Sequence, residues 1–111
     1  MIRPQPADMI ARLWRGRAAG AAGADAYFRH MTATVFPSLK DLAGHRGAWL
    51  LRREIDGRTE FLAMTLWESR QAIEAFAGHD IGKAVVEPEV QAVLVEFDDF
   101  ASHYEVAFKA P

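Results

Sequence analysis

The chain has 111 residues, of which half are hydrophobic and a quarter are charged, and its net charge is −2. This length and balance are typical of a globular domain with a core of its own. The absence of cysteine excludes disulfides, thiolate metal sites and cysteine nucleophiles, and it is consistent with a cytoplasmic location. Acidic and basic residues are interleaved without a basic stripe, so we expect no nucleic acid as partner. No apolar run approaches the roughly 20 residues of a membrane span, so we expect no membrane association.

The domain organisation that we expect is simple. Residues 1–8 contain two prolines and no apolar run, so they are predicted to be an N-terminal extension rather than a signal peptide. A single domain is predicted over residues 9–108, with a short tail over residues 109–111. The chain shows neither an internal repeat nor a low-complexity segment.

The first half of the domain begins with a strand and a helix. Met9–Arg15 is predicted to be the first strand, and the small residues of Gly16–Gly23 are predicted to form a turn. From Ala24 an apolar stripe of period 3.6 predicts an amphipathic helix. We expect this helix to end near Phe36, because the residue before Pro37 avoids helical angles.

Gly47–Trp67 carries the clearest local signal in the chain. Two strand-like runs flank Asp56-Gly57, a preferred pair for a two-residue hairpin turn of type I′. The turn fixes the register and places Arg53 opposite Glu60 as a cross-strand ion pair. The same register pairs Leu51 with Leu62, Trp49 with Met64, Leu50 with Ala63, Arg52 with Phe61 and Arg46 with Trp67.

The two faces of this hairpin differ in composition. The face of Trp49 and Met64 is apolar except near the turn, so we expect it to lie beneath the helices. The opposite face mixes large apolar side chains with arginines. Monomers rarely expose so large an apolar patch, so we expect a second copy to cover this face and form a homodimer. The predicted interface residues are Trp14, Leu50, Phe61 and Trp67.

The second half of the domain adds helices and a final strand. Ser69 is a good N-cap for a helix that ends at Gly78. Asp80 is predicted to cap a further short helix, which Pro88 stops. Ala101–Phe108 alternates and is predicted to be the last strand. The resulting order predicts an α+β fold of the ferredoxin-like (split βαβ) type, an antiparallel sheet with helices on one face.

No catalytic constellation stands out in the sequence. The histidines lack the spacing of metal ligands, and no serine lies in a nucleophile motif, so we expect no metal site and no acyl-transfer chemistry. His30, beside the apolar stripe of the first helix, and His103, on the last strand, are the weak candidates for a general base. Arg12 is a weak candidate for stabilising an anion. For the histidines the commoner alternative is a ring at the surface.

Aromatic and sulfur-containing side chains remain as a further feature. Placed between helices and sheet, they form either a plain core or an apolar pocket for a flat aromatic ligand. The residues predicted for such a pocket are Leu13, Tyr27, Met31, Trp49, Met64, Ile73 and Phe76.

Met64–Phe76, in which a strand ending in Trp runs into a Ser-capped helix, resembles the antibiotic biosynthesis monooxygenase superfamily. The segments His103–Val106 and Met9–Gly16 are similar to one branch of it, and the similarity spans about residues 9–108. The resemblance implies a ferredoxin-like subunit, a dimeric α+β barrel and a ligand cavity between each sheet and its helices. It also implies cofactor-free oxygenation of polycyclic aromatics or oxidative haem breakdown as possible activities.

The haem-degrading branch of that superfamily uses an Asn on the first strand, a Trp after the Ser cap and a His further on. Ala11, Phe76 and Val86 stand at these positions here, Ala11 by a looser alignment, which argues against haem degradation. We therefore expect a cofactor-independent monooxygenase that acts on a small aromatic or polycyclic substrate. The alternative is a non-catalytic homodimer that binds a small apolar molecule.

Overall fold

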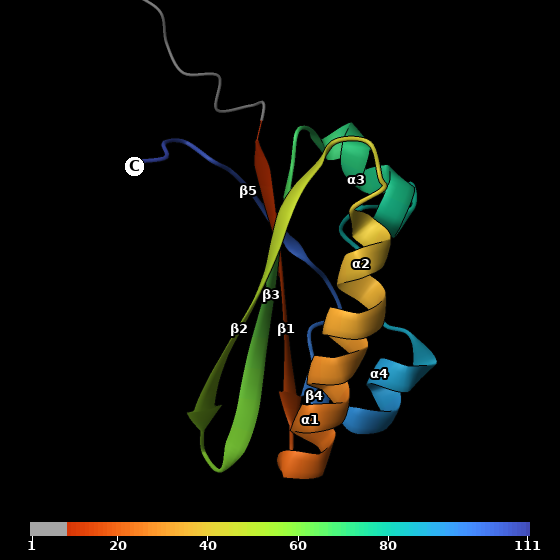
Figure 1. The fold of residues 1–111 in the computed structure, drawn as a ribbon, viewed down its shortest axis with the longest axis vertical. Coiled ribbons are helices and arrows are strands. Elements are labelled where there is room, and N and C mark those ends of the chain that lie inside the picture. Colours follow the sequence, from red (N-terminus) through yellow and green to blue (C-terminus); the bar gives the residue numbers. More distant parts are fainter. Residues whose placement is uncertain (1–8) are drawn as a thin grey trace, which may run out of the picture.

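The structure is a computed structural model that describes residues 9–111, so the predicted extension over residues 1–8 lies outside the described residues. An antiparallel sheet carries helices on one face, which confirms the predicted α+β, ferredoxin-like arrangement (Figure 1). The strands are β1 (Ile10–Ala18), β2 (His45–Ile55), β3 (Arg58–Trp67), β4 (Glu96–Phe97) and β5 (Ser102–Glu105). The helices are α1 (Ala21–His30), the π-helical turn η2 (Met31–Val35), α2 (Phe36–Leu39), α3 (Arg70–Ala77) and α4 (Pro88–Val93).

Strand β1 lies at the centre of the sheet. It pairs with β3 along its whole length, and β3 pairs in turn with β2. On its other side β1 pairs with β4 near Gly16 and with β5 near Ile10. The predicted last strand, Ala101–Phe108, is confirmed only over Ser102–Glu105.

Strand β1 continues beyond Arg15, where a turn was predicted, because Gly16 still pairs with Phe61 of β3. Gly16 serves close packing here rather than a turn. A Cβ atom at this position would lie 2.6 Å from Cδ1 of Leu94, so any larger residue would displace the Leu94 side chain at the end of α4.

The hairpin register follows the prediction from Ile55 to Gly47. Asp56 and Gly57 have φ of 53° and 74°, as a type I′ turn requires. Nε of Arg53 donates to Oε2 of Glu60 over 2.8 Å, which confirms the expected ion pair. One predicted pair is wrong: a bulge at the start of β2 places His45, and not Arg46, opposite Trp67.

The first helical segment does not end at Phe36. The π-helical turn η2 joins α1 to α2, and Phe36 keeps helical angles, φ −61° and ψ −42°. Pro37 then lies at the start of α2, directly after the π-helical turn. The helical run therefore extends to Leu39.

In the second half, Oγ of Ser69 accepts a hydrogen bond from the backbone N–H of Ala72 over 3.1 Å, which confirms the predicted cap of α3. The short helix predicted after Asp80 is wrong, because residues 80–87, all of them described, form turns and extended chain. Pro88 begins α4 instead of ending a helix, since proline fits the first helical turn. None of the helices in the described part of the chain is long and apolar enough to cross a membrane.

The helices cover the face of the sheet opposite to the predicted one. Phe61 and Trp67 are 0% exposed beneath them, whereas Trp49 is 45% exposed on the other side. Both faces of the sheet carry large apolar side chains. The alternation of side chains along the strands therefore assigned each residue to one of two faces, but it did not show which face the helices cover. The predicted interface residues Trp14, Leu50, Phe61 and Trp67 therefore all belong to the covered face.

The uncovered side of the sheet is called the open face below. Leu13, Met64 and Trp49 are neighbours in a row across β1, β3 and β2, so three of the predicted pocket residues lie on this face and away from the helices. The same face also carries the apolar residues Ala11, Leu51, Ile55, Leu62 and Leu66.

Two core clusters pack between sheet and helices. One centres on Tyr27 and Phe61, whose ring centroids lie 4.8 Å apart. The other centres on Trp67, which stacks on Phe76 at 6.3 Å and packs against the fully buried Ile73. Residues of both clusters line one cavity, so the fold leaves a gap where the two halves of the core meet.

Candidate functional site: a cavity between sheet and helices

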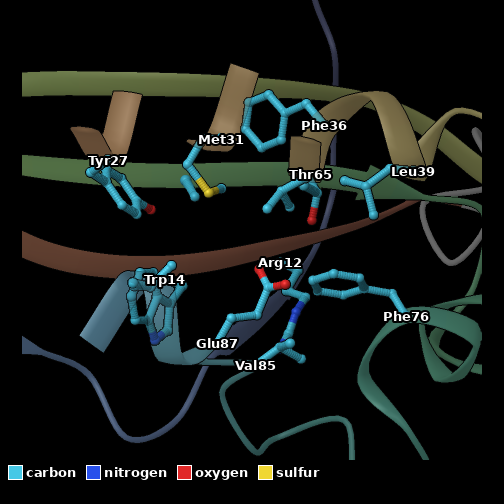
Figure 2. A pocket seen from close by; sticks show the side chains of 13 residues that line it. Arg12, Trp14, Tyr27, Met31, Phe36, Leu39, Thr65, Phe76, Val85 and Glu87 are labelled. Atoms are coloured by element: carbon cyan, nitrogen blue, oxygen red, sulfur yellow. The ribbon is translucent and has the colours of Figure 1, made fainter. Parts of the chain in front are cut away.

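The cavity lies between the covered face of the sheet and the surrounding helices (Figure 2). Its volume is about 60 Å³, which is room for a few water molecules and far below the roughly 300 Å³ of a typical small-molecule site. The walls are mainly apolar and aromatic. The lining residues are Arg12, Trp14, Tyr27, Met31, Val35, Phe36, Leu39, Ala63, Thr65, Phe76, Val85, Glu87 and Val90.

Arg12 places a buried positive charge in this cavity. The residue is 5% exposed, and its guanidinium donates to the carbonyls of Ile81 and Lys83 over 3.2 and 3.1 Å and lies 5.6 Å from the ring centre of Phe76. Burial lowers the pKa of Arg12 to about 10, so the group stays charged at neutral pH. None of the ion pairs within residues 9–111 includes Arg12.

The remaining polar groups inside the cavity are mostly donors. The hydroxyl of Tyr27 is buried and has no hydrogen-bond partner in the part of the chain that the structure describes. Burial raises the pKa of this phenol, which keeps it protonated. Oγ1 of Thr65 accepts from Nε1 of Trp67 over 2.8 Å and retains its own proton to donate. Nε1 of Trp14 already donates to the carbonyl of Asp98 over 2.7 Å, so it is not free for a ligand.

Glu87 is the only acidic residue among those that line the cavity. One of its carboxylate oxygens lies 2.9 Å from Nε2 of His30, and the two side chains are 40% and 14% exposed. Glu89 lies close by, and the ligand atoms of the three side chains are all within 4.8 Å of one another. This group is chemically able to accept a proton or to hold a divalent cation.

The predicted pocket residues divide between the two faces of the sheet. Tyr27, Met31 and Phe76 line the cavity, whereas Ile73 is fully buried beneath Trp67 and does not reach it. Leu13, Trp49 and Met64 lie on the open face, so the structure does not bring them together with the rest.

The three weak catalytic candidates occupy different positions. Arg12 lines the cavity, and His30 reaches its edge through Glu87. His103 pairs with Arg12 across β1 and β5 but is not among the lining residues. Glu87 could act as an acid or base by its residue type, but from the sequence it was set aside as a solvated carboxylate at a helix boundary. No spacing pattern connects it with His30, which lies 57 positions away.

Other lining residues were also missed. Trp14 and Thr65 point toward the helices from β1 and β3, and the inverted assignment of the faces had placed both on the dimer side. The register of β1 and β3 makes Arg12, Trp14, Ala63 and Thr65 neighbours on one face. They could have been predicted together as lining residues if the face beneath the helices had been assigned correctly.

The residues of the cavity do not fit a haem. Phe76 lines it, but Val86 packs against the core and the neighbours of Ala11 lie on the open face. No histidine is among the lining residues, so none of them offers an imidazole ligand to a haem iron.

A protein-family model matches most of the chain. The model of the family described as "Antibiotic biosynthesis monooxygenase" matches residues 16–88, well over half of the chain. The fold is similar to a variant of the cofactor-independent oxygenase SnoaB from Streptomyces nogalater, with a TM-score of 0.65, 16% identity and coverage of 95% of this chain and 99% of that one. No curated protein matches the chain in sequence.

Two further structures show how varied the relatives are. The monooxygenase ActVA-Orf6 of Streptomyces coelicolor, solved with Nanaomycin D, has a TM-score of 0.62 at 16% identity, over 92% of this chain and 89% of that one. The haem-degrading MhuD of Mycobacterium tuberculosis, solved with two haems, has a TM-score of 0.61 at 17% identity, over 92% and 99%. These likenesses show a shared fold. With the family model matched over so much of its length, the chain belongs to the antibiotic biosynthesis monooxygenase family.

Proposed function

We propose that the protein is a monooxygenase that needs no bound cofactor and oxidises a small aromatic or reduced polycyclic substrate in the cavity. The observation that carries this proposal is Arg12, a buried cation without a carboxylate partner in a largely aromatic cavity. A buried charge is costly unless an opposite charge meets it, so such a site favours an anionic aromatic ligand. The fold shared with a cofactor-independent oxygenase supports the same reaction class.

The proposed reaction begins with removal of a proton from an activated CH₂ group of the substrate. The carboxylate of Glu87 accepts this proton, and His30 orients the carboxylate through their contact. Arg12 stabilises the substrate anion, whose charge spreads over the ring and its oxygen. The anion then transfers electrons to O₂, so that CH₂ and O₂ become C=O and H₂O. The substrate supplies all the electrons.

The cavity must widen to admit such a substrate, because its volume is only about 60 Å³. The lining side chains with the most freedom to move are the exposed Val85 and the half-buried Phe36 and Phe76. Their displacement would open space beside Arg12 while keeping the walls apolar. A dry wall strengthens the electrostatic stabilisation of the anion.

The homodimer expected from the sequence is proposed here with a different interface. The open face exposes Trp49 and Leu51 by 45% and 47%, next to the half-buried Leu62 and Met64. An apolar surface of this kind on a sheet is normally covered. We place a second copy of the chain on this face, so that the cavity stays within each subunit and away from the interface.

The reaction is tested by measuring O₂ consumption with anthrone, whose CH₂ group has the required acidity, and by identifying anthraquinone as product. Arg12→Met should lower kcat/KM by roughly 100-fold or more, the scale expected for losing a group that stabilises an anion. Arg52→Met, which removes an exposed arginine, is the matched control and should retain the wild-type rate. Binding of anthrone without O₂ consumption above the buffer rate would favour the non-catalytic ligand-binding alternative.

A further inference from the structure

We propose that the hydroxyl of Tyr27 donates a hydrogen bond to a neutral oxygen of the bound ligand, and that the cavity therefore selects planar rings with two separate oxygen acceptors. One acceptor is ionised and meets Arg12. The other is a ring carbonyl and meets Tyr27. This proposal deepens the proposed function and rests on the same cavity, but it concerns binding and is independent of turnover.

The Tyr27 hydroxyl has no hydrogen-bond partner among the described residues. The residue is fully buried, and its oxygen makes no hydrogen bond within the described part of the protein. Buried polar groups are almost always paired, because an unpaired one loses its hydration without compensation. A phenylalanine would give the same packing without this cost, so the hydroxyl is explained by a partner that arrives with the ligand.

The Tyr27 hydroxyl points into the cavity. The ring of Tyr27 is held between Phe61 and Trp14, with centroids 4.8 and 6.5 Å away. The hydroxyl extends from this contact into the space that the lining side chains enclose (Figure 2). The surrounding rings fix this direction, so the donor is already placed before a ligand binds.

The polar groups that line the cavity include more hydrogen-bond donors than acceptors. Tyr27, Thr65 and the unused N–H groups of Arg12 are donors, and Glu87 is the one carboxylate acceptor among the lining residues. A cavity of this kind favours ligands that are rich in acceptors. Because burial keeps Tyr27 protonated, it suits a neutral carbonyl oxygen, whereas the charge of Arg12 suits an ionised oxygen.

The test compares two ligands of similar outline: 2-hydroxy-1,4-naphthoquinone, which at neutral pH has an ionised oxygen and a ring carbonyl, and naphthalene, which has neither. The chain has no cysteine to which the quinone could add. Quenching of tryptophan fluorescence reports binding, since Trp14 lines the cavity. Tyr27→Phe should weaken binding of the quinone by about threefold to tenfold, the range of one hydrogen bond, and leave binding of naphthalene unchanged. Tyr104→Phe, at an exposed tyrosine of β5, is the matched control and should change neither affinity.

A second measurement shows that the variant is intact. Without ligand, the melting temperature of Tyr27→Phe should equal or exceed that of the wild type, because the substitution removes an unpaired buried hydroxyl. An unchanged affinity for the quinone would overturn the proposal. An equal loss of affinity for both ligands would also overturn it, because that result would report altered packing. Failure of the wild type to bind the quinone would overturn it as well.

The outcome is separable from that of the proposed reaction. Loss of quinone preference in Tyr27→Phe, with no O₂ consumption by the wild type, would support the donor and contradict the reaction. Oxidation of anthrone by the wild type, with an unchanged quinone preference in the variant, would contradict the donor and leave the reaction standing.

Discussion

His103 of β5 stands directly opposite Arg12 of β1, so the buried guanidinium has an imidazole as its cross-strand neighbour. Burial lowers the pKa of His103, and the charges of Arg12 and Arg70 lower it further. Nε2 of His103 is buried and has no hydrogen-bond partner among residues 9–111. The imidazole therefore stays neutral at pH values where an exposed histidine already takes up a proton.

This pairing predicts that the protein loses stability in mild acid. Because the pKa of His103 in the folded chain lies below the ordinary value of about 6.5, the unfolded chain binds the proton more readily, and stability falls as the pH drops below that value. Urea unfolding between pH 8 and 5 should show a smaller fall for His103→Asn than for the wild type. His79→Asn, at a fully exposed histidine, is the control. The same slope in all three proteins would contradict the prediction. His45, whose pKa is also lowered by burial, accounts for a residual slope.

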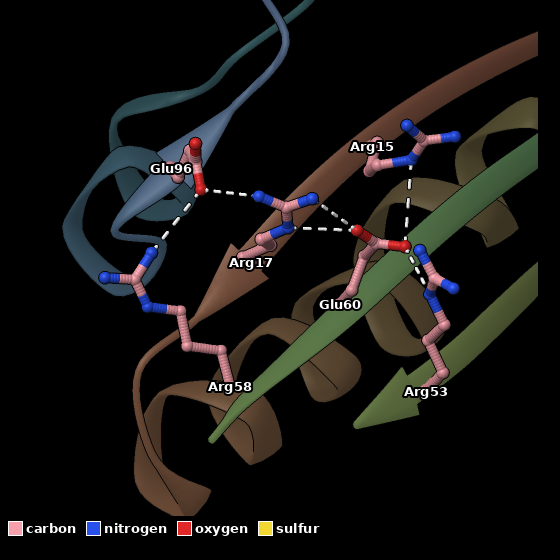
Figure 3. Close-up of polar contacts among 6 residues, drawn as sticks. All are labelled: Arg15, Arg17, Arg53, Arg58, Glu60 and Glu96. Carbon is pink, nitrogen blue, oxygen red and sulfur yellow. Dashed lines mark hydrogen bonds and ion pairs between the residues drawn. The ribbon is translucent and has the colours of Figure 1, made fainter. Parts of the chain in front are cut away.

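Glu60 is the centre of an ionic cluster at the hairpin end of the open face (Figure 3). Its two carboxylate oxygens accept hydrogen bonds from Nε of Arg17 and Nε of Arg53 over 2.9 and 2.8 Å, and Arg15 lies 3.8 Å away. The hydrogen bond from Arg53 and the one from Arg17 hold the pKa of Glu60 below its usual range. The carboxylate thus stabilises the junction of β1, β2 and β3.

Glu60→Gln should lower the free energy of unfolding at pH 7 by about 1 kcal/mol, since charge-assisted hydrogen bonds to two partly exposed arginines, Arg17 and Arg53, are lost. The lowered pKa of the carboxyl means that its contribution is complete above about pH 4.3 and disappears as the pH falls through the folded value. Thermal unfolding at pH 7 and pH 3 measures both effects. The gap between variant and wild type should close in acid, and a gap of equal size at both pH values would rule out the ionic explanation. Glu105→Gln, on exposed β5, is the control.

Some features of the fold could be predicted from the sequence because they depend on local chemistry. Asp56 and Gly57 accept positive φ, so they determined both the turn and the register of the hairpin. The Ser69 cap likewise depends on a hydrogen bond three residues away. Pro37 and Pro88 were both predicted to end a helix, but each lies in the first turn of one. Proline is compatible with a first turn, and the sequence does not show on which side of a proline the helix lies.

The faces of the sheet were assigned wrongly for a different reason. Arginines were taken as a sign of the side away from the helices, but Arg12 is buried and bonded to backbone carbonyls of the segment before α4. The large aromatic side chains of the hairpin did not decide the question either, because Phe61 and Trp67 are buried on the covered face whereas Trp49 is 45% exposed on the open face. The contact of His30 with Glu87 depends on the docking of α4 and left no pattern in the sequence.

The role of Glu87 leads to a test within one short segment. If its carboxylate accepts the substrate proton, Glu87→Gln should lower kcat for anthrone oxidation by about 100-fold or more with little change in KM. Glu89→Gln changes a carboxylate that lies close to the same histidine but does not line the cavity, so it should retain most of the activity. Equal losses in both variants, together with a requirement for an added divalent cation, would contradict the proton acceptor and favour a metal site instead.

The open face predicts the assembly. Light scattering should give about twice the chain mass of 12.4 kDa, and Trp49→Glu should shift the protein to monomer, because it places an unpaired charge in the proposed interface. Phe28→Glu is a closely matched control, since Phe28 and Trp49 are both 45% exposed but Phe28 lies on α1, over the other face.

Substitution of Phe61 or Trp67 would test folding rather than assembly, because both are fully buried within the subunit. A monomeric wild type, or dissociation by Phe28→Glu and not by Trp49→Glu, would contradict the interface. Survival of anthrone oxidation in a monomeric Trp49→Glu would show that the cavity is complete within one chain.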